Sequence, residues 1–325
     1  MMIRWGVIVG LAVSAGAACR APVEESPQAC LSIAAGGADG TRGTHYLFAT
    51  ALARLFNERA LGPCAAAAAT DGSTFNVSVV DEADADFGIA RADTVYTAYV
   101  EGTPLRPSPH TRLRGVAILY GSVLHLVVRA GSPVGAWTEL RDAPVGLSVS
   151  ATDITPVVNY DDLVAAAGDL GPGRVRGVRL PLSELSDALA GGQIAAAFVL
   201  TAYPMASLSE LGRAGGVRLL EVEPDAAARI RARYPFFKPT LLPAGVYAGQ
   251  DDPVRTVAVE NLLVARQDLG EQAVYLLTRT LLENLPRLAR DHAAALQVNP
   301  DLAPATPIPL HPGAARYYRE RELLR

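Results

Sequence analysis

Short apolar runs that suit strands alternate with amphipathic segments that suit helices from about residue 29 onward. This alternation predicts an α/β fold with a largely parallel sheet, because parallel strands need crossover connections that are usually helical. In the first half of the chain we expect strand 29–35, helix 45–60, strand 64–70, strand 86–90, helix 92–100, strand 114–120 and strand 123–129.

A second series follows and could form a second sheet. It consists of strand 144–149, helix 157–168, strand 175–180, helix 183–190, strand 194–200, helix 205–213 and strand 217–222. Beyond it lie a loop-rich stretch (234–253), a strand-like run (254–265), a helix (270–284) and a tail that is helical, then Pro-rich, then charged.

Two α/β series joined by extended apolar runs predict two lobes connected by crossing strands, with a cleft between them. We expect residues 28–126 and 255–325 to form lobe one and residues 127–254 to form lobe two. Ligands of open α/β sheets lie outside the carboxyl ends of the strands, so the loops at these ends are the expected site.

The N-terminus predicts export. Arg4 precedes an apolar run from residue 5 to residue 18, which is the layout of a signal peptide and is too short to span a membrane. Small residues at 15–17 suit an ordinary signal peptidase, whereas 16–19 is similar to a bacterial lipobox that would place a lipid on Cys19. We favour a periplasmic lipoprotein with a signal peptide at 1–18, a tether at 19–27 and no other contact with the membrane.

The cysteine count agrees with a lipid on Cys19. The chain has three cysteines, and lipidation of Cys19 leaves Cys30 and Cys64 as a pair in an oxidising compartment. Each of the two opens a predicted strand, and neighbouring parallel strands would bring them together. A disulfide is therefore expected, with two buried free thiols as the alternative.

Charge and missing motifs exclude several classes of function. Lys plus Arg is 29 against 33 for Asp plus Glu, with no basic block, so a nucleic acid is not an expected partner. The chain has no Cys-x-x-Cys, no His-Glu-x-x-His and no Gly-x-Ser-x-Gly, so no metal, cofactor or catalytic residue is expected. The predicted protein is a monomeric binding protein and not an enzyme.

Five strings in a fixed order resemble one family. They are LSIAAGGADGTRGTHYLFATALARLFNE with the following ATDGS, ADFGIARADTVYTAY, LYGSVLHLVVRAGS, YPFFKPTLLPAGVYAGQDDPVRTVAVENLLVAR and IPLHPGAARYYRE. Together they are similar to the TAXI group of TRAP-transporter solute receptors, over about residues 30–325.

The resemblance implies a two-lobed periplasmic-binding-protein fold of type II. Such a receptor closes on a small ligand, commonly an amino acid or a dicarboxylate, and delivers it to a TRAP-type membrane transporter. Two alternatives keep the fold: a ligand sensor for a membrane kinase and an orphan binding lipoprotein. An enzyme on the same fold is a remote alternative.

The sequence departs from the family pattern at several places. The glycine loop is longer, His45 stands where the family often has Tyr, and Arg91 stands where Gln is frequent. The stretch 148–162 lacks the Gly-Ser-Gly-Thr run with which members start a helix of the second lobe. The fold is therefore more transferable than the identity of the ligand.

The glycine loop is the first candidate for ligand contact. Gly36, Gly37, Gly40 and Gly43 precede Thr44, His45 and Tyr46 between a predicted strand and a predicted helix. Backbone N–H groups at a helix N-terminus favour an anion, while a plain turn that needs glycine is the alternative. Ser73 follows the next turn, where it either caps a helix or contacts the ligand.

Arg91 is the candidate partner for a ligand carboxylate, because it follows a buried strand and a guanidinium binds carboxylates with two parallel hydrogen bonds. The alternative is a surface ion pair between Arg91 and Asp93. Tyr120 and Tyr203 could close over the ligand from the two lobes, or belong to the core.

Three more residues, one of them in the core, complete the prediction. Thr152 and Asp153 could line the altered loop, although the Asp153 carboxylate would repel an anion there. His125 lies within an apolar strand and is expected to be a hydrogen-bonded core histidine.

Overall fold

The computed structural model describes residues 30–36, 41, 43–59, 64–148, 160–170, 174, 176–180 and 182–324. The predicted signal peptide, tether and lipidated Cys19 lie outside the described residues, as do Thr152 and Asp153. The strands are β1 (Leu31–Gly36), β2 (Ala65–Thr70), β3 (Phe87–Arg91), β4 (Leu113–Arg129), β5 (Pro144–Ser148), β6 (Arg176–Leu180), β7 (Ala196–Thr201), β8 (Val217–Leu220), β9 (Lys238–Leu242) and β10 (Val254–Arg266).

Most helices begin and end close to the predicted segments, but the helices Ser73–Asp81 and Pro224–Arg233 were not predicted. They are α1 (Thr44–Asn57), α2 (Ser73–Asp81), α3 (Ala92–Val100), α4 (Tyr160–Ala167), α5 (Leu182–Ala190), α6 (Ala206–Arg213), α7 (Pro224–Arg233), α8 (Glu271–Glu283), α9 (Leu285–Asp291) and α10 (Pro312–Glu320), with short 3₁₀ turns η2 (Trp137–Leu140) and η3 (Ala293–Gln297). No helix among the described residues is long and apolar enough to cross a membrane.

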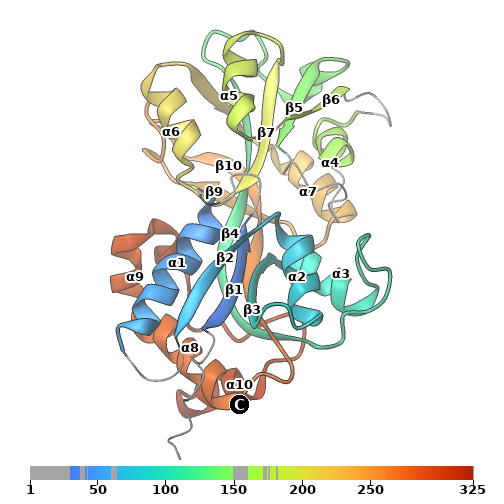
Figure 1. Ribbon diagram of the computed structural model, residues 1–325. Coiled ribbons are helices and arrows are strands. Elements are labelled where there is room, and N and C mark those ends of the chain that lie inside the picture. The colour runs from blue at the N-terminus through green and yellow to red at the C-terminus, as the bar shows by residue number, and fades with distance from the viewer. Residues whose placement is uncertain are drawn as a thin grey trace, which may run out of the picture.

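The molecule has two lobes, and Figure 1 shows β1, β2 and β3 with α1–α3 and α8–α10 in one lobe and β5, β6 and β7 with α4–α6 in the other. The strands β2-β1-β3 are parallel, and so are β6-β5-β7. This confirms the predicted α/β fold with a largely parallel sheet in each lobe. The second series does not form a separate sheet, however, because one ten-stranded sheet continues through both lobes. Its order is β2-β1-β3-β10-β4-β7-β5-β6, with β8 paired to β4 and β9 paired to β10 outside this path.

The two lobes are joined by β4 and β10, which pair antiparallel along most of their length. The predicted strands 114–120 and 123–129 are one strand of 17 residues. Gly121, which interrupts the apolar pattern there, packs against β10, where a Cβ atom on it would lie 3.4 Å from that of Ala258. We call residues 120–123 of β4 and 258–261 of β10 the lobe junction. At the end of this junction, between Glu260 and Leu262, the register of the pairing of β10 with β4 shifts.

Lobe one has a core between the sheet and the helices α1, α8 and α10. The buried side chains of α1 recur at helical spacing, among them Phe48, Leu52 and Phe56. They pack with Leu277 of α8 and Tyr318 of α10 in one cluster. The amphipathic pattern of α1 thus fixes its N-terminus at the carboxyl end of β1.

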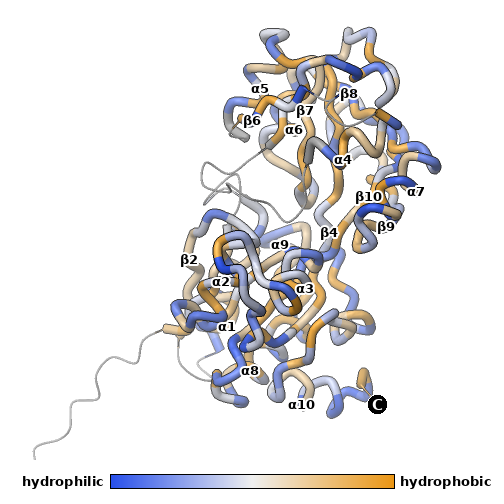
Figure 2. Tube along the Cα trace, turned by 90° about the vertical axis from the view of Figure 1, so that its right-hand side faces the viewer, coloured by the Kyte–Doolittle hydropathy of each residue, from blue (hydrophilic) through white to orange (hydrophobic). Residues whose placement is uncertain are grey.

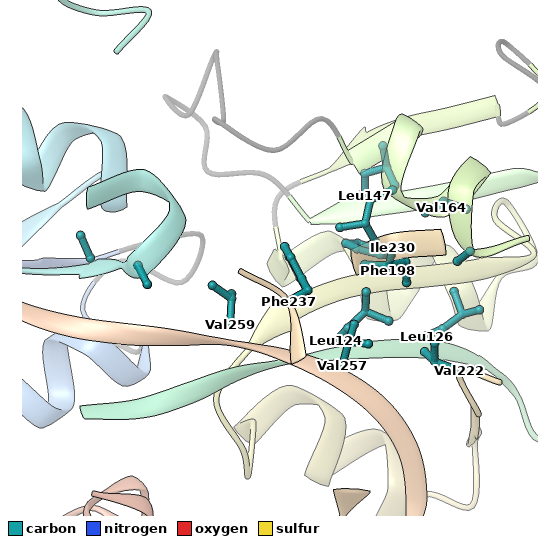
Figure 3. Packing of buried hydrophobic residues seen from close by; sticks show 14 of the residues in the cluster. Leu124, Leu126, Leu147, Val164, Phe198, Val222, Ile230, Phe237, Val257 and Val259 are labelled. Carbon is teal, nitrogen blue, oxygen red and sulfur yellow. The ribbon is translucent and has the colours of Figure 1, made fainter. Parts of the chain in front are cut away.

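A second cluster runs through the lobe junction and links the lobes. It contains Val80 and Leu113 of lobe one together with Leu126 and Phe198 of lobe two. Figure 3 shows the Phe237 side chain beside Val259 of β10. Figure 2 places β4 and β10 at the waist between the lobes.

The predicted disulfide is present. Cys30 and Cys64 are bonded, with their Cα atoms 4.5 Å apart. They precede the parallel strands β1 and β2, in which Leu31 is paired with Ala65. The disulfide therefore fastens the edge strand β2 to the sheet at the end opposite the candidate site.

Candidate functional site

Three helices of lobe one begin at the carboxyl ends of three strands. β1 ends at Gly36 before α1, β2 ends at Thr70 before α2, and β3 ends at Arg91 directly before α3. Among the residues that the structure describes, none provides a side-chain cap to any of the three helices, and neither α1 nor α2 has an acidic residue in its first turn. Because a helix N-terminus carries a partial positive charge, this edge of the sheet favours an anionic group.

The strand ends at this edge lie very close together. A Cβ atom on Gly36 would collide with the carbonyl oxygen of Thr70 on β2. Asn76 of α2 is fully buried and donates a hydrogen bond from its Nδ2 to the Ile89 carbonyl of β3 at 2.7 Å. The backbone N–H of Arg91 donates to the Ser73 Oγ at 3.1 Å, so the start of α2 is tied to the end of β3.

Arg91 is paired with Asp93. Its Nε and Nη2 atoms donate to the two carboxylate oxygens of Asp93, both at 3.1 Å. The side chains are only 10% and 7% exposed. The pairing predicted as an alternative is thus present, but it is buried and not on the surface. The carboxylate of Asp93 compensates the charge of Arg91 at this edge.

A hydrogen-bonded group that the sequence did not reveal links α1 to the lobe junction. Asn261 of β10 is fully buried and lies opposite Arg91 in the pairing of β10 with β3. Its Oδ1 lies 2.9 Å from the Nε2 of His45, and its Nδ2 donates to the Tyr120 carbonyl and the Ser122 Oγ, both at 2.9 Å. Asn261 is the single uncharged polar residue inside the apolar run VAVENLLVA, and this is the signal by which the sequence could have pointed to it.

Tyr120 belongs to the core of lobe one. It is 1% exposed, and its ring centroid lies 5.0 Å from that of Phe48 and 5.9 Å from that of His45. Its hydroxyl has no hydrogen-bond partner within the described part of the chain. Burial raises the pKa of this phenol well above its ordinary value. The core alternative describes Tyr120, although its hydroxyl belongs to a residue of the lobe junction.

Two predicted residues lie apart from this group. Tyr46 lines a groove of about 560 Å³ between α1 and β2, together with Thr50, Arg54 and Asn57. Tyr203 packs against the lobe-two cluster that contains Tyr247. The structure therefore brings Gly43, Thr44, His45, Ser73, Arg91, Asp93 and Tyr120 to one edge of lobe one, but not Tyr46 or Tyr203.

His125 is the core histidine that the sequence predicts. Its Nδ1 donates to the Val123 carbonyl at 2.9 Å, which leaves its Nε2 to accept from the Tyr247 hydroxyl at 3.0 Å. The Tyr247 oxygen in turn accepts the backbone N–H of Met205 at 3.2 Å. Burial lowers the pKa of His125 to about 4, so the ring is neutral at physiological pH.

The described residues contain no group of three His, Cys, Asp or Glu side chains that could hold a metal ion. The candidate site is therefore built from helix N-termini, one compensated ion pair and neutral polar groups. Such a site suits the binding of a small polar molecule.

Comparison with known proteins gives a family and a set of similar structures. A model of the NMT1-like family matches residues 33–321. The periplasmic aliphatic sulphonate binding protein SsuA from Escherichia coli is 14% identical, with 92% of this chain and 95% of that chain covered and a TM-score of 0.49. A putative periplasmic sulfonate-binding protein SsuA from Methylobacillus flagellatus KT is 12% identical, with 92% and 89% covered and a TM-score of 0.48. A substrate binding protein of an amino acid ABC transporter is 12% identical, with 82% and 97% covered and a TM-score of 0.43.

Proposed function

The chain belongs to the NMT1-like family, and from this premise we propose that it is an extracytoplasmic solute-binding receptor. It closes on a small anionic ligand of the amino acid or dicarboxylate class and delivers it to a TRAP-type membrane transporter, as its resemblance to the TAXI group implies. A lipid on Cys19 holds it at the membrane, and it performs no catalysis.

One observation carries the proposal: the uncapped N-termini of α1 and α2 meet at the carboxyl ends of β1 and β2, beside the lobe junction. Neither first turn contains an acidic side chain that would compensate the helix dipole. An anionic group of the ligand bound there accepts hydrogen bonds from the backbone N–H groups of the turn that starts at Gly43.

Binding at this edge supports closure of the lobes. The site lies on lobe one, and β4 and β10 lead from it directly into lobe two. A ligand that also contacts lobe two binds the closed state better than the open state and shifts the population toward it. We assign the lobe-two contacts to Tyr203 and Thr152.

The ion pair with Asp93 limits how Arg91 can contribute to ligand binding. Because Asp93 already compensates its charge, Arg91 cannot attract an anion as an isolated cation would. The pair instead offers both signs of charge to a ligand. A zwitterionic amino acid matches that arrangement, with its carboxylate toward Arg91 and its ammonium toward Asp93.

The ligand is tested by thermal shift on the purified protein with a panel of amino acids and C4 to C6 dicarboxylates. A ligand present at about 100 times its dissociation constant stabilises the native state by about 2.7 kcal/mol. A panel without a single stabilising compound contradicts the proposed ligand class.

Two matched variants locate the bound ligand. Thr44→Asp places a carboxylate in the first turn of α1, where it stabilises the free helix and repels an anion. Thr50→Asp places the same charge at an exposed position further along α1. We expect calorimetry to show loss of binding for Thr44→Asp and wild-type binding for Thr50→Asp. Equal affinities of the two variants would exclude the α1 N-terminus from the site.

Delivery to the transporter needs its own test. Proteoliposomes that contain TRAP-type membrane subunits from the same genome should accumulate the ligand only when the purified receptor is added. Uptake that is the same without the receptor contradicts the transport role and leaves the ligand assignment intact.

A further inference from the structure

Both ring nitrogens of His45 face oxygen atoms that can only accept a hydrogen bond. The Nδ1 atom lies 3.2 Å from the Gly36 carbonyl oxygen, and the Nε2 atom lies 2.9 Å from the Asn261 Oδ1. A neutral imidazole carries one N–H and one lone pair. In the neutral ring, one nitrogen therefore points its lone pair at an acceptor oxygen.

The amide of Asn261 cannot turn to relieve this conflict. Its Nδ2 lies 2.9 Å from the carbonyl oxygen of Tyr120, which accepts the hydrogen bond. If the amide were turned around, Oδ1 would face that carbonyl and two acceptors would meet. The oxygen of Asn261 consequently stays on the side of His45.

We propose that His45 is a proton-binding site of the molecule, whose occupied form donates hydrogen bonds both to the end of β1 and to the lobe junction. The imidazolium donates from Nδ1 to Gly36 and from Nε2 to Asn261, whereas the neutral ring can donate to only one of them. Gly36 is the last residue of β1, and Asn261 lies on a crossing strand. Protonation thus adds a hydrogen bond between the first turn of α1 and one of these two strands.

The groups that face His45 decide the direction of the pH response. Arg91 of β3 repels a positive ring, and its charge is compensated by Asp93 of α3. His292, which lies between α9 and η3, interacts with His45 electrostatically, and Tyr120 of β4 stacks on its ring. Burial lowers the pKa of His45 below its ordinary value, while the contacts with Asn261 and Gly36 raise it. The ring is therefore neutral at neutral pH and gains its second N–H on acidification.

The titration of His45 tests the proposal in the ligand-free protein, so the result does not depend on the proposed receptor function. Protein labelled with ¹⁵N in its five histidines is followed by long-range ¹H–¹⁵N correlation from pH 8 to pH 4, with His45→Gln as the assignment control. We expect one N–H at the high end and imidazolium shifts at the low end. A His45 ring that stays neutral to pH 4 overturns the proposal.

A pair of Asn→Asp variants tests the contact with β10. Asn261→Asp puts a carboxylate beside the ring and should raise the midpoint of His45 by about one pH unit or more. Asn284→Asp makes the same change at a buried position whose contacts are with Arg59 and Thr280, and should leave the midpoint unchanged. Equal midpoints in the two variants overturn the proposal.

Hydrogen exchange in the wild-type chain gives a readout of His45 protonation that does not need Asn261→Asp to fold. Burial lowers the pKa of His45, so the ring binds its proton more tightly when the site opens to water. Protection of the amides in the first turn of α1 and of β10 near Asn261 should therefore fall as His45 becomes protonated, after correction for the intrinsic rates. In His45→Gln the protection should not change over the same pH range. Wild-type protection that is independent of pH contradicts the proposal.

Discussion

At the scale of single residues, the pair formed by Arg91 and Asp93 sets the strongest constraint on the site. Breaking a buried ion pair by removing one partner typically costs about 3 to 5 kcal/mol, because the other charge is left buried. We expect Arg91→Gln to destabilise the ligand-free protein by about this amount, as measured by urea unfolding. The sequence alone did not predict this loss of stability, since it did not reveal that the pair is buried.

The double variant Arg91→Gln with Asp93→Asn controls this prediction. Removing both charges leaves no unpaired ion, so the double variant should recover part of the stability that Arg91→Gln loses. Asp93 also accepts the backbone N–H of Thr94 at 2.8 Å, so recovery is expected to be incomplete. Strictly additive losses from the two single variants would show that the pair is not coupled.

His125 makes stability depend on pH. Its pKa is lowered by burial to about 4 in the folded protein and is about 6.5 in the unfolded chain. Between these values the unfolded chain binds the additional proton, so the free energy of unfolding falls as the pH falls from about 6.5 to about 4. The loss reaches about 3 kcal/mol near pH 4, and above about pH 6.5 this histidine contributes no pH dependence.

Chemical denaturation of His125→Gln at several pH values checks this prediction. The variant lacks the titrating ring, so the difference in unfolding free energy between wild type and variant should shrink as the pH is lowered from 7 to 4. The variant Ser209→Ala, which lies outside the His125 contacts, serves as a control whose curve parallels the wild type. A His125→Gln curve that also runs parallel to the wild type would contradict the assigned pKa.

At the scale of elements, the disulfide between Cys30 and Cys64 holds the edge strand β2. It closes a loop with a sequence separation of 34 residues. In the chain-entropy model such a cross-link stabilises by about 3 to 4 kcal/mol. The double variant Cys30→Ala with Cys64→Ala should lose about this much in urea unfolding. Reductant should destabilise the wild type and leave the double variant unchanged, whereas equal stability of the two proteins would contradict a structural role.

The sequence predicted most strands and helices because their apolar periodicity is the same signal that buries them. It failed where a local pattern and the tertiary context disagree. Gly121 and Ser122 suggested a break between two strands, yet β4 continues because Gly121 fits against β10. Pro239 suggested a loop, but β9 is an edge strand that pairs only with β10, and an edge tolerates proline.

The candidate site was predictable in outline but not in its connections. Glycine spacing and strand ends located Gly43, His45 and Arg91 at one edge, since carboxyl ends of parallel strands meet there. Which polar atoms pair depends on the register between β3 and β10, and that register places Asn261 opposite Arg91. Asn261 and Arg91 are 170 residues apart in the sequence, and no pattern along the chain encodes a pairing over that separation.

At the scale of the whole molecule, the lobes share a sheet and a core. β4 and β10 run through both lobes, and one cluster joins Val80 and Leu113 to Leu126 and Phe198. Lobe one is also assembled from two separate parts of the chain, on either side of lobe two. Because the cluster that contains Val80, Leu113, Leu126 and Phe198 spans both lobes, we expect the protein to unfold in a single cooperative transition.

Tryptophan fluorescence can test this cooperativity, because the chain has only two tryptophans. Trp5 lies in the predicted signal peptide, so Trp137 is the reporter in the predicted mature protein. It is buried in lobe two and donates to the Glu221 carbonyl at 2.8 Å. Leu52→Ala removes a fully buried side chain from lobe one and should destabilise by about 2 to 5 kcal/mol. If the lobes unfold together, Leu52→Ala in lobe one lowers the midpoint of the Trp137 transition, and so does Leu126→Ala in lobe two. For both variants the shift of the midpoint should be in the same proportion to the loss of stability measured by calorimetry. A Trp137 transition that ignores Leu52→Ala would mean that lobe two unfolds independently, in spite of the shared strands.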